Sequence, residues 1–296
     1  MKKNILTCSA LFILGITYAQ KITVSDGSEK FSNGSHNAYS ATIYETSKNV
    51  AMSNFKSLLK DLKNEKVKTD NGEIFGDNIL IKEWGNNPVD IYATFEENKA
   101  AKTVIVHVAF DLGGAYLSGS DGDKHNYAKK MVKDFVVNTT KESMGNKVKQ
   151  LEDILEKLEE NQKDLLKDDK NLKQDIVNYK QEIVKDEKDI ASKKTELEKK
   201  KSEIDVQKKV VDASSGAVNE QAKSSQKIHE KLMDQEKDIQ KEIKNLKDDI
   251  ESSNNKIKKA ESDLKKNESD QVTKKSEIDA QKKLVDDAKK VMEKVD

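Results

Sequence analysis

Histidines are the first residues in this chain to consider for chemistry, and there are four: His36, His107, His125 and His229. None forms an HxH, HxxxH or HExxH pattern, the local spacings by which neighbouring histidines converge on a zinc ion. His107 alternates with valines and is expected on one face of a β-sheet, whereas His229 is expected as a polar layer in a helical seam. We therefore predict no metal site and no catalytic histidine.

A Gly- and Asp-rich loop, residues 113–123, is the second candidate for chemistry. An EF-hand calcium loop needs an oxygen ligand at its fifth position and a Glu at its twelfth. Counted from Asp121, these positions hold His125 and Val132. The simpler interpretation is a loop that caps the following helix through Asp123.

Motifs for nucleotides and nucleophiles give no stronger signal. The pair Gly113-Gly114 lacks the spacing of a GxGxxG or Walker loop, and no GxSxG motif occurs. The sequence thus predicts no catalytic residue, no cofactor-binding residue and no cofactor, and we expect a protein that is not an enzyme. The aromatic residues Trp84, Tyr92 and Tyr116 are the candidates for a ligand-binding surface, although such residues also pack on sheet faces.

The charge balance argues against nucleic acid as a partner. The chain carries 54 basic and 54 acidic residues, and every basic residue is a lysine. Arginine is the usual bidentate ligand of phosphates and guanine edges, so a balanced chain without arginine lacks the expected basic footprint. The single cysteine, Cys8, lies near the N-terminus, and we expect no disulfide in the mature protein.

Residues 1–19 have the order of a secretory signal peptide: Lys2 and Lys3, an apolar run, and small residues that end at Ala19. A membrane anchor is the alternative, but the apolar run of about 12 residues is short of the ~20 needed to span a bilayer. A lipoprotein signal at Cys8 would lie too early and lacks a small residue before the cysteine. We expect export to the periplasm or medium, with no membrane span after signal removal.

After a flexible segment, residues 20–37, the sequence predicts an α+β head domain over residues 38–143. Alternation of apolar and polar residues indicates strands, and helical spacing indicates two helices, one capped by Ser47 and the other containing Tyr127 and Phe135. The predicted order β-α-β-β-β-α forms an antiparallel sheet with both helices on one face. The predicted strands are 38–45, 78–84, 89–95 and 103–110, and the first helix, 47–63, has an apolar face of Val50, Phe55, Leu58, Leu59 and Leu62.

Residues 144–296 are predicted to form a coiled coil of two tandem repeats, 151–212 and 225–286. The repeats match at 28 of 62 positions, including a shared KKSEIDxQKK. Core positions recur every seventh residue in two rows, one that begins at Leu151 and one that begins at Leu155. Most heptads supply one aliphatic core residue, so the apolar seam is thin.

An antiparallel hairpin satisfies this seam better than a parallel dimer, in which identical charges such as Lys193 would face each other. A turn near residues 213–217, the Gly-bearing break, lets the two repeats pair with numbers that sum to 429. This register pairs Leu172 with Ile257 and Leu165 with Leu264, and it places Lys193 opposite Glu236. A continuous rod and a parallel dimer are the alternatives.

These patterns favour an exported cell-envelope structural or interaction protein. The small head would bind another envelope component, and the coiled-coil arm would act as a spacer or protein-docking element. The alternative is a head that is an enzyme or small-ligand-binding module, with the coil used for homo-oligomerisation. In either case we expect a protein partner in the envelope, which the sequence does not identify.

Overall fold

The computed structural model describes residues 21–62, 66–214 and 220–296. These residues form two compact units. The first, which we call the head unit, comprises the described residues up to Glu156 together with Asp279–Asp296, and the second, the arm unit, is Lys157–Ile278. The predicted signal peptide at residues 1–19 lies outside the described residues.

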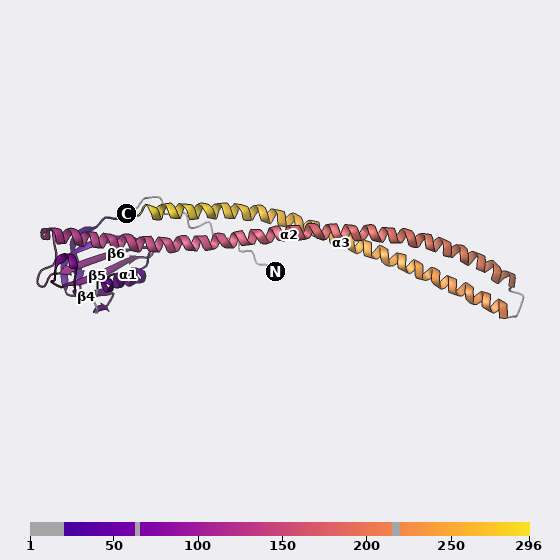
Figure 1. The fold of residues 1–296 in the computed structure, drawn as a ribbon, viewed down its shortest axis with the longest axis horizontal. Helices are drawn as coiled ribbons and strands as arrows, with labels where there is room; N and C mark the ends of the chain where they lie inside the picture. Colours follow the sequence, from indigo (N-terminus) through magenta and orange to yellow (C-terminus); the bar gives the residue numbers. More distant parts are fainter. Residues whose placement is uncertain (1–20, 63–65, 215–219) are drawn as a thin grey trace. The chain divides into compact units, whose positions relative to one another are not determined.

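One antiparallel sheet of six strands builds the head unit (Figure 1). The strand order is β1-β2-β6-β5-β4-β3, so that every neighbouring pair is antiparallel. The strands are β1 (Ser25–Phe31), β2 (Gly34–Tyr44), β3 (Val67–Asp70), β4 (Glu73–Ile79), β5 (Val89–Asn98) and β6 (Thr103–Asp111). The predicted class, an antiparallel sheet followed by long helices, is confirmed.

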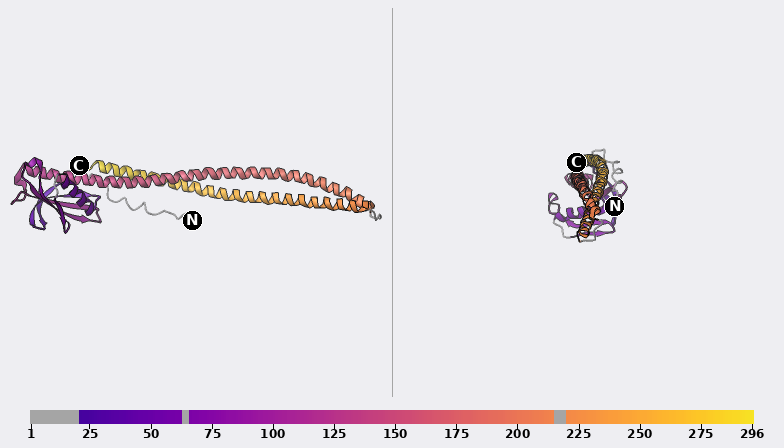
Figure 2. Two further views of the ribbon diagram at one scale, coloured as in Figure 1. Left: turned by 60° about the horizontal axis from the view of Figure 1, so that its bottom comes forward. Right: turned by 90° about the vertical axis from the view of Figure 1, so that its right-hand side faces the viewer.

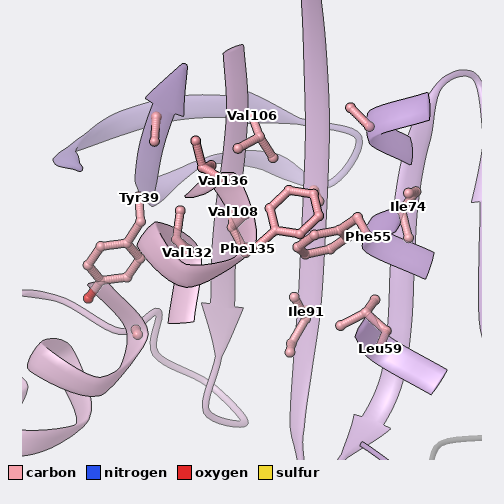
Figure 3. Packing of buried hydrophobic residues seen from close by; sticks show 14 of the residues in the cluster. Tyr39, Phe55, Leu59, Ile74, Ile91, Val106, Val108, Val132, Phe135 and Val136 are labelled. Atoms are coloured by element: carbon pink, nitrogen blue, oxygen red, sulfur yellow. The ribbon is translucent and has the colours of Figure 1, made fainter. Parts of the chain in front are cut away.

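Helices cover one face of this sheet. Helix α1 (Lys48–Asp61) and the first turns of α2 (Asp123–Ser214) pack on it, and Phe55 of α1 meets Phe135 of α2 at a ring-centroid distance of 5.0 Å (Figure 3). Alternate residues of the central strands, among them Val106 and Val108 of β6, are fully buried beneath the two helices. Both helices therefore lie on one face, as predicted.

Local chemistry sets the start of α1. The side chain of Ser47 accepts a hydrogen bond from the backbone N–H of Val50, which confirms the predicted N-cap. Phe55 and Leu59 are buried as predicted, but Val50 is 40% exposed and does not belong to the core.

Three predictions on the head were wrong in detail. The segment 20–37 is not free of regular structure, because residues 25–31 form β1 and pair with β2. The predicted order also lacked the short edge strand β3. The strand predicted at 78–84 lies earlier, at β4, because Asn78 has a φ of 57° and the pairing with β5 shifts there; residues 82–84 form a 3-10 turn instead.

The end of the chain completes the core of the head unit. Val295 is 1% exposed and belongs to the same apolar cluster as Phe55, and Met292 packs against this cluster. The backbone N–H of Ile22 donates a hydrogen bond of 3.1 Å to the carbonyl of Asp296. The head unit is thus assembled from both the beginning and the end of the described chain.

Two antiparallel helices form the arm unit: the part of α2 from Lys157 to Ser214, and the part of α3 (Glu220–Glu293) that ends at Ile278 (Figure 2). The residues shielded from solvent in α2 follow the two predicted heptad rows, and those in α3 follow the equivalent rows 74 positions later. The predicted helical hairpin is confirmed, whereas the turn predicted near residues 213–217 lies mostly outside the described residues, because α2 continues to Ser214.

The register of the hairpin differs from the predicted one. The side-chain amide of Asn267 donates to the carbonyl of Leu165, and that of Gln207 donates to the carbonyl of Ser225, so both pairs sum to 432 rather than 429. Lys193 lies 2.7 Å from Glu242, and the prediction that it faces Glu236 was wrong. Side chains that reach backbone carbonyls fix the register, and a pattern of aliphatic residues does not reveal them.

Candidate functional site

The sheet face opposite α1 and α2, which we call the open face, carries the candidate functional residues. Successive side chains of a strand point to opposite faces, so His107 and Ala109 of β6 lie on the open face while Val108, between them, lies in the core. Antiparallel pairing places Ser40 of β2 and Thr94 of β5 on either side of His107. The predicted sheet-face position of His107 is confirmed.

A polar cluster surrounds His107, which is 7% exposed. The Nδ1 atom of His107 lies 2.7 Å from the Oγ of Ser40 and 3.4 Å from the carboxylate of Glu29. On the other side of the ring, Nε2 lies 3.9 Å from the carboxylate of Glu96 and has no hydrogen-bond partner among the described residues. Four strands thus contribute to one buried imidazole and its neighbours.

This geometry differs from that of a Ser-His-acid hydrolase. In such a triad the serine and the acid contact opposite nitrogens of the imidazole, so that one side of the ring takes the serine proton and the other side is oriented. Here Ser40 and Glu29 both lie at Nδ1, and the hydroxyl of Ser40 is itself 3.5 Å from the Glu29 carboxylate. The arrangement favours a hydrogen-bonded link between β1, β2 and β6 over a proton relay to serine.

Aromatic residues gather beside the polar cluster on the open face. We call them the aromatic cluster: Phe31, His36, Phe75, Tyr92 and Tyr116. The His36 and Tyr116 rings stack, with centroids 3.7 Å apart and planes 7° from parallel. Tyr92 bridges the group, since its ring lies 4.8 Å from Phe75 and 6.3 Å from Tyr116.

The tip of the β1–β2 hairpin folds over this cluster. The backbone N–H and the hydroxyl of Ser32 donate hydrogen bonds of 2.9 and 2.7 Å to the carboxylate of Glu73 on β4. The amide of Asn33 donates to the hydroxyl of Tyr116 at 2.7 Å. Because β1 and β4 are distant in the strand order, these bonds close part of the open face, and Phe31 is only 4% exposed beneath the tip.

The tyrosines of the cluster are held in their neutral form. Burial raises the pKa of Tyr92 to about 12, with smaller contributions from Tyr116 and nearby carboxylates. Burial also raises the pKa of Tyr116, although its hydrogen bond from Asn33 acts in the opposite direction. Two partly exposed phenols that stay protonated offer flat apolar faces and hydroxyl groups for hydrogen bonding.

Trp84 does not belong to this surface. Its ring packs on the helix-covered side, 5.5 Å from Phe110 and 5.9 Å from Tyr127, and the residue is 9% exposed. The structure therefore brings together two of the three predicted aromatic candidates, Tyr92 and Tyr116, and separates the third. Trp84 lies in a 3-10 turn rather than a strand, so strand alternation could not assign its face.

The remaining candidates take structural roles. Asp121 of the Gly-rich loop accepts hydrogen bonds from the backbone N–H and hydroxyl of Ser118, at 2.7 and 3.1 Å, within a capping box. His125 lies 2.9 Å from the hydroxyl of Tyr39 through its Nδ1 atom. His229 lies on a heptad row of α3, as predicted, and is partly shielded from solvent.

Sequence reasoning missed several residues of the open face. His36 and Asn33 lie in a segment predicted to be flexible, and Phe75 precedes the predicted strand. A weaker signal was present, because Ser32 and Asn33, residues of types common in turns, join Ser25–Phe31 to Gly34–Tyr44.

Comparisons of the chain with protein-family models, with curated proteins and with solved structures found no match. Within the described residues, no helix contains an apolar stretch long enough to cross a membrane.

Proposed function

We propose that this chain is an exported cell-envelope interaction protein in which the open face of the head binds a partner protein and the arm serves as a spacer. The observation that carries the proposal is the intramolecular closure of the arm. Its heptad seam is already occupied by the other half of the same hairpin, through contacts such as Asn267 to Leu165 and Lys193 to Glu242.

The pairing of the two helices within one chain helps to decide whether the arm acts as a spacer or joins two chains. A coiled coil that joins two chains needs an apolar stripe directed outward. In the arm unit, seam residues such as Ile176, Ile190 and Ile257 are less than 10% exposed within the single chain. The large apolar side chains that remain exposed fall at several different heptad positions rather than on one stripe: Leu166, Val177, Val184, Val206, Val210, Ile228, Met233 and Val272.

The open face supports the binding role of the head. Aromatic side chains with a polar tip are enriched at recognition surfaces, because they supply contact area and a hydrogen bond with little loss of conformational freedom. Tyr92 and Tyr116 have this character and are partly exposed. The carboxylates of Asp90 and Asp111 lie near both phenols, so the surface favours a partner with donor groups or positive charge.

Site-specific photo-crosslinking tests this function in the envelope of the source cell. A photoreactive amino acid would replace Tyr116 in one variant and Asn178, an exposed residue of the arm, in a matched control. We expect one discrete adduct from position 116 and none from position 178. Adducts from position 178 alone, or from neither position, would contradict a head-centred binding function.

A further inference from the structure

A groove lies in the head unit, lined by none of the residues of the aromatic cluster. It is a groove of about 980 Å³ formed by the start of α1, the β5–β6 turn, α2 between Ser143 and Ile154, and the last turns of α3. We call it the basal groove. Its volume is at the upper end of the range for small-molecule sites, about 300–1,000 Å³.

The floor of the basal groove is apolar and exposed. Val50 is 40% exposed and Ile154 is 43% exposed, although both are large aliphatic residues. Leu151, Leu284 and Val291 extend the same lining. Aliphatic side chains gathered in a concavity gain free energy when another apolar group covers them, so this floor suits an alkyl chain.

A buried hydroxyl group also lines the groove. Thr46 is 9% exposed, and its Oγ1 atom has no hydrogen-bond partner among the described residues. Its backbone N–H donates to the carbonyl of Lys102, which fixes the residue beside the basic rim. Buried polar groups are nearly always hydrogen-bonded, so this covered and unpaired hydroxyl beside the groove is an exception.

The rim of the basal groove carries an excess of positive charge. Five lysines line it against three carboxylates, those of Glu45, Glu97 and Asp287. Glu45 is paired with Lys147 at 3.0 Å, and Glu97 accepts a hydrogen bond from the backbone N–H of Lys48. Lys99, Lys102, Lys290 and Lys294 complete the lysines of the rim, and the excess of lysines over carboxylates favours an anionic group.

We propose that the basal groove binds a single-chain amphipathic carboxylate, with its alkyl chain on Val50 and Ile154 and its carboxylate beside the rim lysines. A second copy of the chain would set one lysine-rich rim against another. The proposal does not depend on the partner-binding role of the open face.

Isothermal titration of the full chain from Gln20 onward with decanoate and with decanol, each below its aggregation limit, tests the headgroup. We expect decanoate to bind at least about tenfold more tightly than the neutral alcohol, a difference of about 1.4 kcal/mol. Equal binding of the two would overturn the anionic assignment. Absence of decanoate binding up to about 1 mM, where even a weak site of about −4 kcal/mol is half filled, would overturn the site itself.

Substitutions in the groove test where the alkyl chain of decanoate binds. Ile154→Asp places a charge on the apolar floor and should weaken decanoate binding at least about tenfold. Ile228→Asp is the matched control, because Ile228 is 49% exposed on the arm unit, and its affinity should equal that of the parent chain. Lys290→Glu with Lys294→Glu, which leaves the floor intact, should also weaken decanoate binding but not decanol binding. Equal decanoate affinity in all variants would refute the proposal. It would also be refuted if the parent chain formed a dimer that Ile154→Asp dissociates and decanoate does not, because the groove would then be covered by a second copy of the chain.

Discussion

Tyr39 and Tyr92 lie on opposite faces of the same sheet, and burial raises the pKa of each phenol to about 12. In the unfolded chain both side chains ionise near their ordinary value of 10.0. Between these two values the folded head holds more protons than the unfolded chain, so its stability falls as the pH rises. The contribution is fully present below pH 10 and is lost as the pH approaches 12.

This linkage predicts an alkaline weakening of the head. The urea midpoint of the head, followed by the fluorescence of the single tryptophan, Trp84, should fall steadily above pH 10. Tyr39→Phe and Tyr92→Phe should each flatten that decline, because a phenylalanine has no proton to lose. Tyr179→Phe, on the arm unit, is the matched control and should leave the profile unchanged. A midpoint that is constant across the alkaline range would contradict the burial of both phenols.

Residue chemistry was only partly readable from the sequence. Alternation in β6 was sufficient to place His107 opposite the valines of its strand. Its partners Ser40 and Glu29 come from two other strands, and the pairing that joins them is non-local, so no spacing pattern could reveal the cluster. The same reason explains why the stack of His36 on Tyr116 was not predicted.

At the scale of elements, periodic segments were predicted well and irregular ones poorly. The long heptad rows of α2 and α3 and the alternating strands β5 and β6 were identified because each repeats one simple pattern many times. β1 was missed because its sequence, SDGSEKF, is polar and its pairing with β2 depends on a tight turn. The hairpin topology could be predicted from the sequence. The register could not, because it depends on contacts such as the hydrogen bond from Asn267 to the carbonyl of Leu165.

The register of the arm can be tested with engineered cysteines, since the chain from Gln20 onward has none. The short side chain of Asn267 reaches the carbonyl of Leu165 at 3.1 Å, so cysteines at 165 and 267 should form an intramolecular disulfide rapidly. The matched pair is 165 and 264, the partners that the aliphatic pattern alone predicts, and it should oxidise several-fold more slowly. Gel mobility under non-reducing conditions at low protein concentration measures both rates.

Two outcomes of the cysteine experiment would count against the structure. Faster oxidation of the 165–264 pair would support the register predicted from the aliphatic pattern. Disulfides found only between chains would show that the arm forms an intermolecular coiled coil and not a hairpin. In that case the arm would serve oligomerisation, and the spacer role in the proposed function would fail.

At the scale of the whole molecule, the central claim is that the two ends of the described chain meet in one core. The arm repeats lie between these ends in sequence, yet Val295 is buried with Phe55 and the carbonyl of Asp296 accepts a hydrogen bond from Ile22. The head unit is therefore discontinuous in sequence, and a boundary drawn at residue 143 separates residues that share one core. A sequence pattern could not predict this, because Val295 looks like one more aliphatic position of the heptads.

Replacing Val295 by aspartate tests this claim most directly. Val272→Asp is the matched control, because Val272 is a valine of α3 that is 72% exposed. Buried beside an apolar core, the new carboxylate of Val295→Asp should lower the free energy of unfolding by at least about 2 kcal/mol, whereas the control should change it by less than about 0.5 kcal/mol. Urea denaturation monitored by Trp84 fluorescence gives both values. Equal midpoints for the two variants would contradict a head whose core includes Val295, two residues after the end of α3.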